Sequence, residues 1–145
     1  MSNGGVKAIV YSGAEVTVKE KKSKLIINKK FYLKKDSKLY SSKNSKIFDG
    51  EILKAENTKQ GYLELSADIN KQSLAKNFKE SVRQVENLYY ENCGTCHTAY
   101  EPLKYSSEEW KVMMQSMKFQ SGLTDFENKQ ISRYVSLFSL DSRNK

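Results

Sequence analysis

Both cysteines and the only histidine of this 145-residue chain lie within five consecutive residues, Cys93 to His97, in the stretch CGTCH. A C-x-x-C pair can carry out thiol–disulfide exchange, but that motif normally accompanies a βαβ unit, and the sequence around it predicts helices without a parallel sheet. Two thiolates and one imidazole can also bind zinc, but the sequence has no further Cys or His for a fourth ligand. Each of these two patterns is incomplete in this sequence, so disulfide exchange and zinc binding are alternative interpretations and not the preferred one.

The same residues also form the C-x-x-C-H pattern of covalent haem attachment. Two thiols separated by two residues can reach the two vinyl groups of a porphyrin from one turn of chain. The imidazole of the next residue then lies under the iron and ligates it axially. We therefore predict one covalent haem c, attached through Cys93 and Cys96, with His97 as the first axial ligand.

The second axial ligand cannot be a histidine of this chain, so methionine is the remaining soft ligand. Apart from Met1, the sequence has three methionines, Met113, Met114 and Met117. At about 100° per residue, all three lie within about 60° of Trp110 on one face of a helix. At least two of them must therefore do something else, such as fill the core. We expect Met117 to be the ligand, with Met114, Met113, lysine, water or an open site as alternatives.

Three helices are expected after residue 70, from apolar residues spaced three and four apart. The second begins with a capping box, in which Ser106 is followed three residues later by Glu109, and Gly122 is a suitable stop. Thr124 and Asp125 can cap the third helix. The apolar face of the first is Leu74, Phe78, Val82, Val85 and Tyr89. The apolar face of the third is Phe126, Ile131, Tyr134, Val135 and Phe138. The side chains expected to pack on a porphyrin or on one another are Leu88, Tyr89, Trp110, Tyr134 and Phe138.

Residues 6 to 68 alternate apolar and polar side chains with period two, which is typical of half-buried strands. Turn signals follow one another closely, at 12–13, 35–37, 49–50 and 57–61, so we expect a small antiparallel barrel. Its core would contain Leu25, Ile27, Phe31, Leu33, Leu39, Ile47, Ile52, Leu53, Leu63 and Leu65. In the segment KKFYLKK, neighbouring side chains point to opposite faces, which places Phe31 inside and Tyr32 outside.

The net charge of +8 is concentrated in residues 1–70, which hold 14 lysines against eight acidic residues. This basic half favours an acidic partner, nucleic acid or an anionic surface, unless it is only a solvated lysine-rich face. We do not expect nucleic acid, because Tyr32 alone is a poor surface for successive stacked bases. No apolar run approaches the length of a membrane-spanning helix, and no secretory signal begins the sequence. A cytosolic protein and an exported one whose signal has been removed both fit this observation.

Residues 88–135 resemble the C-terminal monohaem domain of the pentahaem cytochromes c that feed periplasmic trimethylamine-N-oxide or S-oxide reductases. The matching positions are Leu88, Tyr89, Cys93, Cys96, His97, Pro102, Trp110, Met117, the GLTD turn and Tyr134. Met117 follows Trp110 by seven residues, as the family's methionine follows its tryptophan. Residues 38–69 resemble the β segment that precedes the haem domain in that family, and also a bacterial SH3-type barrel.

The resemblance implies a periplasmic electron carrier in anaerobic respiration, without enzymatic activity. It would take electrons from an upstream membrane quinol-oxidising cytochrome and pass them to a molybdenum-cofactor oxide reductase. The implied fold is α+β, with an SH3-like antiparallel barrel over residues 1–69 and a three-helix, class I-like cytochrome c domain over residues 70–145. The family's tetrahaem half is absent from the sequence, so either it has been trimmed or this is a free-standing monohaem relative that receives electrons from another cytochrome. A related expectation is an export signal or a membrane anchor before residue 1. A haem sensor, or a protein-binding partner of the reductase system, is the alternative function.

Within this interpretation the haem would be held by Cys93, Cys96, His97 and Met117, with Tyr89 and Trp110 against it; the iron ligands would be His97 and Met117. We also expect the second ring nitrogen of His97 to donate to a carbonyl in the following loop, near Pro102, which would fix its tautomer.

Overall fold

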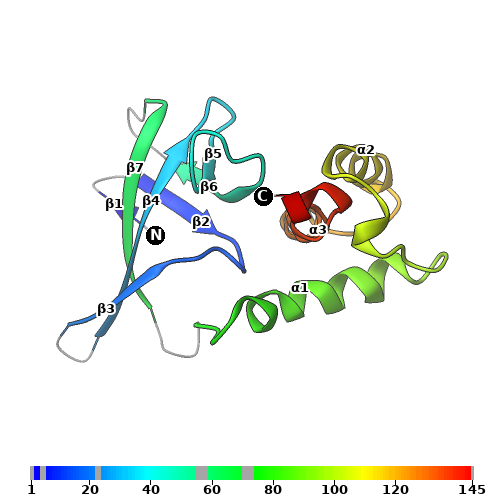
Figure 1. Ribbon diagram of the computed structural model, residues 1–145, viewed down its shortest axis with the longest axis horizontal. Coiled ribbons are helices and arrows are strands. Elements are labelled where there is room, and N and C mark those ends of the chain that lie inside the picture. Colours follow the sequence, from blue (N-terminus) through cyan, green and yellow to red (C-terminus); the bar gives the residue numbers. More distant parts are fainter. Residues whose placement is uncertain (1, 4–5, 22–23, 55–58, 70–73, 145) are drawn as a thin grey trace. The chain divides into compact units, whose positions relative to one another are not determined.

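The computed structural model describes residues 2–3, 6–21, 24–54, 59–69 and 74–144. The chain divides into two compact units, Met1–Ser81 and Val82–Lys145, called here the β unit and the helical unit (Figure 1). This division falls inside helix α1 (Phe78–Cys93). The domain boundary expected between residues 69 and 70 borders residues 70–73, which lie outside the described ranges, and it stays a prediction.

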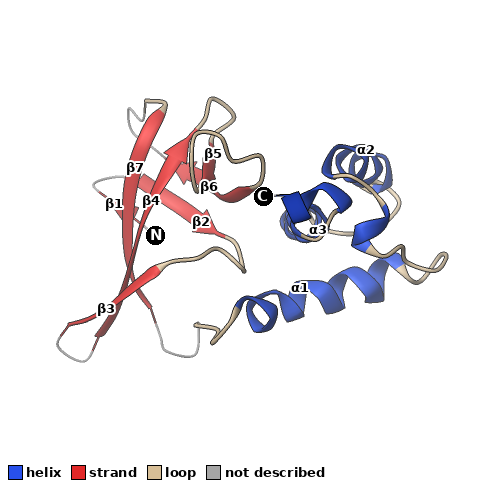
Figure 2. Cartoon of the chain, in the orientation of Figure 1, coloured by secondary structure: helices blue, strands red, loops and turns tan. Residues whose placement is uncertain are grey.

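The β unit is a curled antiparallel sheet (Figure 2). Its strands are β1 (Ser2–Asn3), β2 (Val6–Val10), β3 (Thr17–Lys21), β4 (Lys24–Leu33), β5 (Lys38–Tyr40), β6 (Phe48–Lys54) and β7 (Gly61–Ile69). They follow the order β3-β4-β5-β6-β2-β1-β7, and β4 pairs with β7 as well as with its two neighbours. This extra pairing brings distant strands of the order together, so the sheet curls as the predicted small antiparallel barrel requires.

Alternation along β4 and β7 separates an inner from an outer set of side chains. Phe31 and Leu65 are fully buried, and Leu33, the next inward residue of β4, is nearly so. Between Phe31 and Leu33, Tyr32 lies on the other face, with its ring centroid 5.1 Å from that of Tyr62, its partner on β7. Successive strand residues point to opposite faces, so this pattern is the period-two alternation seen in the sequence. The placement of Phe31 inside and Tyr32 outside is confirmed.

The predicted core of the β unit is wrong at Leu53, which is 50% exposed. Its neighbour Ile52 packs against the core instead, and two adjacent residues of β6 cannot both face inward. The predicted core residues that are buried are Ile27, Phe31, Leu33, Leu39 and Leu65. Those that are only half-buried are Leu25, Ile47, Ile52 and Leu63. The alternation therefore gives the faces correctly for most strands and fails where two apolar residues adjoin.

The helical unit contains three α-helices, as predicted: α1, α2 (Ser107–Met117) and α3 (Asp125–Leu137). Two short 3-10 helices accompany them, η2 (Pro102–Lys104) and η3 (Leu140–Asn144). The buried core is made of Val82, Val85, Tyr89, Trp110, Met114, Ile131, Tyr134 and Val135. All three helices contribute to this core, so each one is stabilised by burial of its apolar face against the other two.

Two capping boxes define where α2 and α3 begin. Ser106 accepts a hydrogen bond from the backbone N–H of Glu109, whose carboxylate accepts from the backbone N–H of Ser106. Thr124 and Glu127 form the same arrangement at α3, where the Glu127 carboxylate accepts from the Thr124 N–H at 2.8 Å. These reciprocal bonds satisfy donors that the first helical turn leaves without partners. Both predicted helix starts are confirmed.

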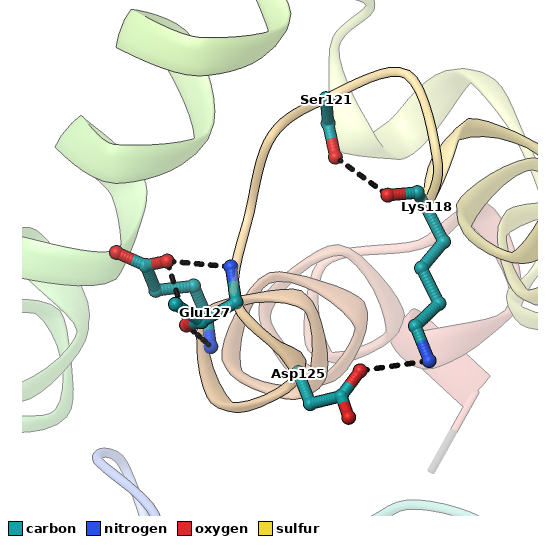
Figure 3. A network of polar contacts seen from close by, with 5 residues as sticks. Lys118, Ser121, Asp125 and Glu127 are labelled. Atoms are coloured by element: carbon teal, nitrogen blue, oxygen red, sulfur yellow. Dashed lines mark hydrogen bonds and ion pairs between the residues drawn. The ribbon is translucent and has the colours of Figure 1, made fainter.

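The linker between α2 and α3 is held at its ends by polar contacts (Figure 3). The Lys118 ammonium lies 2.8 Å from the Asp125 carboxylate, and the Ser121 hydroxyl donates to the Lys118 carbonyl. Gly122, predicted to stop the helix, lies beyond Met117, the last residue of α2, and has a φ of +66° that other residues adopt only with strain. Its role is therefore to turn the linker.

For α1 and α3, the predicted apolar faces begin before the residues that are buried. Leu74 precedes α1, and Phe78, its first residue, is 46% exposed; Phe126, in the first turn of α3, is 44% exposed. The first turn of a helix extends past the packed core, so the apolar period continues where burial does not. Within the described parts of the chain, no helix has both the length and the apolar character that crossing a bilayer would need.

Asp141, in η3, connects the end of the chain to the start of α2. Its carboxylate accepts from the Ser107 N–H at 2.8 Å, from the Ser107 hydroxyl at 2.7 Å and from the Ser139 hydroxyl at 2.8 Å. The Ser107 hydroxyl, the Ser139 hydroxyl and the Ser107 N–H together hold the pKa of this carboxyl well below its usual range. Ser139 is fully buried, so this polar cluster closes one end of the helical unit.

We predict that Asp141→Ala lowers the free energy of unfolding of the helical unit by about 2 kcal/mol at neutral pH, because charge-assisted hydrogen bonds are lost. Urea unfolding followed by the fluorescence of Trp110, the single tryptophan, measures this. The folded-state pKa of Asp141 is depressed, so its contribution is complete above the unfolded-state pKa of about 4 and declines as the pH falls below it.

The matched control is Asp125→Ala, which removes an ion pair whose side chains are 43% and 75% exposed. We expect a clearly smaller loss of unfolding free energy from this control, because solvent screens an exposed ion pair. An equal loss from both substitutions, or a difference between wild type and Asp141→Ala that grows in acid, would contradict the assigned role of Asp141.

Candidate functional site

The CGTCH motif lies where α1 ends. Cys93 is the last residue of the helix and is half-buried against the core of the helical unit, whereas Cys96 and His97 are exposed. Both cysteines are free thiols. Burial, and to a smaller extent the neighbouring Cys96, raises the pKa of the Cys93 thiol. A redox-active C-x-x-C pair needs a depressed thiol pKa, so this environment disfavours the disulfide-exchange interpretation.

The turn that carries the motif coils directly on the helix end. The Gly94 N–H donates to the Tyr90 carbonyl at 3.0 Å, and the Thr95 hydroxyl donates to the Asn92 carbonyl at 2.9 Å. A Cβ atom at position 94 would lie only 2.5 Å from the Tyr90 carbonyl oxygen. A glycine between the two cysteines is therefore what allows the chain to approach the helix so closely. Sequence reasoning missed this requirement, although the glycine itself was the signal.

The imidazole of His97 is oriented by the chain that follows it. Its Nδ1 lies 3.0 Å from the Thr98 carbonyl oxygen, which can only accept, so Nδ1 carries the proton and Nε2 has a lone pair for a ligand bond. The expected carbonyl in the following loop is present, but its predicted place near Pro102 is wrong. The Pro102 carbonyl instead accepts the indole N–H of Trp110 at 2.7 Å.

The three methionines share one helical face in the sequence pattern, but they differ in burial in the structure. Met114 is 4% exposed and belongs to the core, and Met113 is half-buried and packs against it. Met117, the last residue of α2, is half-buried and lies outside the residues that form or contact this core. Of the three thioethers, that of Met117 is therefore the least committed to packing.

Tyr89 and Trp110, both expected beside a cofactor, lie in the protein core. Their ring centroids are 6.1 Å apart and their planes are nearly perpendicular, and the Tyr89 ring also contacts that of Tyr134 at 5.9 Å. Tyr134 in turn contacts Phe138 at 5.1 Å. These aromatic side chains pack on one another, which is one of the two arrangements predicted.

Desolvation raises the pKa of both buried phenols, so they remain neutral donors. The Tyr89 hydroxyl donates to the Tyr100 carbonyl at 2.5 Å, and the Tyr134 hydroxyl donates to the Glu86 carboxylate at 3.0 Å. For Tyr134 the hydrogen bond to Glu86 adds to the effect of burial. The first bond joins α1, before the motif, to the loop after it. Neither long-range contact has a local signal in the sequence.

The side chains of the site fit covalent haem attachment better than zinc binding or disulfide exchange. Among the described residues, no group of three or more His, Cys, Asp and Glu side chains is arranged to hold a metal ion directly, which disfavours zinc. Two reduced thiols, an imidazole with an available Nε2 and a thioether outside the core are the groups that covalent haem requires. The residues present therefore fit an iron porphyrin attached at Cys93 and Cys96.

Comparison with known proteins agrees with this assignment. A family model described as dihaem cytochrome c matches residues 89–145, from Tyr89 through the motif and α2 to the end of the chain. No curated protein and no solved structure matches the sequence. The match supports a cytochrome c domain that carries covalent haem c over most of the helical unit. Two covalent haems of this kind need two C-x-x-C-H motifs, and this sequence has the cysteines for one.

We predict that Met114→Ala and Met117→Ala differ in their effect on the fold itself. Met114→Ala should lower the free energy of unfolding by about 2–4 kcal/mol, because it leaves a cavity in the core. Met117→Ala should cost less than about 1 kcal/mol, because its side chain fills no part of that core. The measurement is urea unfolding of the full chain produced without haem, followed by Trp110 fluorescence. Equal losses would show that Met117 is a packing residue.

Proposed function

We propose that this chain is a periplasmic c-type cytochrome that carries single electrons through one covalently bound haem c. The observation that supports this most directly is the CGTCH turn at the end of α1, within a region matched by a cytochrome c family model. Cytochrome c domains are electron carriers and are typically extracytoplasmic, which agrees with a periplasmic location and with the absence of an enzymatic role.

The side chains of the motif have separate tasks in this proposal. Cys93 and Cys96 would hold haem c through thioether links, and His97 would ligate its iron through Nε2. Haem c, when bound, supplies a one-electron iron couple. The Thr98 carbonyl holds the proton on Nδ1 of His97, so the ring keeps the tautomer needed for ligation and its nitrogen remains electron-rich. Gly94 keeps the turn close to the helix end, where Cys93 packs against the core and Cys96 is exposed on the turn.

Met117 is proposed as the second axial ligand. Its thioether is half-buried and outside the core, whereas Met114 is enclosed and Met113 packs on the core. A thioether favours ferrous iron, so His/Met ligation gives a higher reduction potential than two histidines would. If Met117 does not ligate the iron, Met114, Met113, a lysine or water could, and only an open site would favour the alternative of a haem sensor.

The proposed electron acceptor is a molybdenum-cofactor N- or S-oxide reductase, and the donor is an upstream membrane quinol-oxidising cytochrome. The support is the resemblance over residues 88–135 to the cytochromes of such systems. Positive side chains near the motif also fit docking on an acidic surface. The Lys104 ammonium lies 4.0 Å from the ring centroid of Tyr100, which itself contacts His97 at 5.6 Å.

We predict that the full chain, produced with cytochrome c maturation machinery, gains the mass of one haem and shows c-type absorption. Its ferric form should have a weak long-wavelength band from methionine sulfur to iron. Met117→Ala should abolish this band, and Met113→Ala, the matched control on the same helix, should keep it. Colourless protein with the mass of the bare chain would refute the haem proposal as a whole.

The same spectra distinguish the alternative function. Carbon monoxide should bind the ferrous wild type slowly, because methionine must first leave, and should bind Met117→Ala rapidly. Rapid binding to both proteins would instead indicate a five-coordinate iron, and the haem sensor would then replace the electron carrier.

We predict that the reduced cytochrome is reoxidised by a trimethylamine-N-oxide reductase only when trimethylamine N-oxide is present. The rate should fall with added salt, because long-range attraction between exposed charges is screened within about 8–10 Å at moderate ionic strength. Stopped-flow absorption of the haem measures this rate. No reoxidation with substrate present would reject this acceptor class and leave the haem assignment intact.

A further inference from the structure

A pocket of about 460 Å³ opens on the β unit, and none of the residues that line it belongs to the candidate haem site. It lies where the ends of β4 and β6 meet the start of β7. Its lining residues are Leu33, Lys34, Lys35, Ser37, Ile52, Leu53, Lys54 and Gln60. The volume is within the range of pockets that bind small molecules or molecular headgroups.

The charged side chains that line the pocket are all lysines. Lys34 is fixed, because its ammonium donates to the Ser45 carbonyl at 2.7 Å and lies 3.9 Å from the centroid of the Tyr40 ring. Lys35 and Lys54 are exposed on the rim. None of the described residues that line the pocket is acidic, so the positive charge of its lysines favours an anion.

Asp36, which lies between the lining residues Lys35 and Ser37 in the sequence, is engaged elsewhere. Its carboxylate accepts from the Lys38 N–H at 3.1 Å and from the Tyr40 hydroxyl at 3.0 Å. These bonds hold the carboxylate on its own turn, although it lies between Lys35 and Ser37 in the sequence. The turn therefore places Lys35 and Ser37 at the pocket, whereas the Asp36 carboxylate is bound within the turn.

The backbone of the same turn is strained and firmly anchored. Ser37 has a φ of +61° and is the only described residue other than glycine with a positive φ. The Ile52 N–H donates to the Ser37 carbonyl at 2.9 Å, which ties the turn to β6. Backbone strain of this kind persists where surrounding contacts enforce it, and it is concentrated at ligand sites. The Ser37 hydroxyl and the Gln60 amide add polar groups at the pocket wall.

Apolar surface adjoins this charge. Leu53, the residue wrongly predicted to be in the core, is 50% exposed and lines the pocket beside Lys54. An exposed leucine next to lysines suits the boundary between headgroups and acyl chains, where apolar side chains enter and lysines meet phosphates. A free phosphate ester would use the lysines and leave Leu53 without a role.

We propose that this pocket binds the phosphate of an anionic phospholipid, with Leu53 at the acyl boundary, so that the β unit docks on a membrane surface. The excess of lysine over acidic residues in residues 1–70 supplies the long-range attraction toward such a surface. The site does not depend on the haem, so its test is separate from that of the proposed function.

The test is co-sedimentation of the full chain with phosphatidylcholine vesicles, with and without phosphatidylglycerol. Wild type should bind only the vesicles that contain phosphatidylglycerol. The double substitution Lys35→Gln with Lys54→Gln should weaken the partition about 25-fold, at about fivefold per lysine near the surface. The matched control is Lys43→Gln with Lys46→Gln, which removes the same charge from exposed sites of the same unit and should change the partition less than about threefold.

The contribution of Leu53 has its own control. Leu53→Ser should weaken vesicle binding several-fold, and Val18→Ser, at a residue 42% exposed on the same unit, should leave it unchanged. All six positions are exposed lysines or half-exposed apolar residues, so the variants should fold, and far-ultraviolet circular dichroism checks that they do.

Three outcomes would overturn the proposal. Equal losses from the two double substitutions would show that the attraction depends on total charge and not on the pocket. Glycerol phosphate that releases the protein from vesicles at millimolar concentration, with Leu53→Ser unchanged, would indicate a site for a free phosphate ester. Wild type that fails to bind phosphatidylglycerol vesicles would exclude the lipid altogether.

Discussion

The hydrogen bond from the Tyr89 hydroxyl to the Tyr100 carbonyl is the constraint on which the haem site depends. Tyr89 lies four residues before Cys93 and is 2% exposed among the rings of Trp110 and Tyr134. Its hydroxyl binds the chain on the far side of the motif, so this hydrogen bond joins the two ends of the segment from α1 through CGTCH. Breaking it would leave the hydroxyl of the buried Tyr89 side chain without its partner, and such groups are costly. The motif is exposed, but the two ends of the segment that carries it are joined.

The parts of this protein that the sequence predicted well are those specified by residues close together in the chain. Both helix starts follow from capping boxes with three-residue spacing, and the faces of β4 follow from strict alternation. The three methionines show the limit of such reasoning. The helical period places all of them on one face, and only their different burial in a packed core separates Met114 from Met117.

Features that depend on distant residues were not predictable. Asp141 bonds Ser107 from 34 positions away, and Tyr134 reaches Glu86 across 48. Neither pair has a local signature, because exposed and buried polar residues look alike in a sequence. The error at Leu53 has a local origin instead, since Ile52 and Leu53 adjoin in β6 and only one of two adjacent strand residues can face inward. The partner for the His97 ring nitrogen was misplaced because the Pro102 carbonyl is already occupied by Trp110.

The unequal exposure of the two motif thiols makes them chemically distinct to anything that arrives from solvent. The sulfur on the turn, at Cys96, can be reached without any movement of the fold, whereas the sulfur at the helix end is partly covered by the core. A limiting amount of an alkylating reagent would therefore label position 96 first and position 93 only as the last turn of α1 frays. The surroundings of the motif therefore set the order in which its thiols are modified, with Cys96 before Cys93.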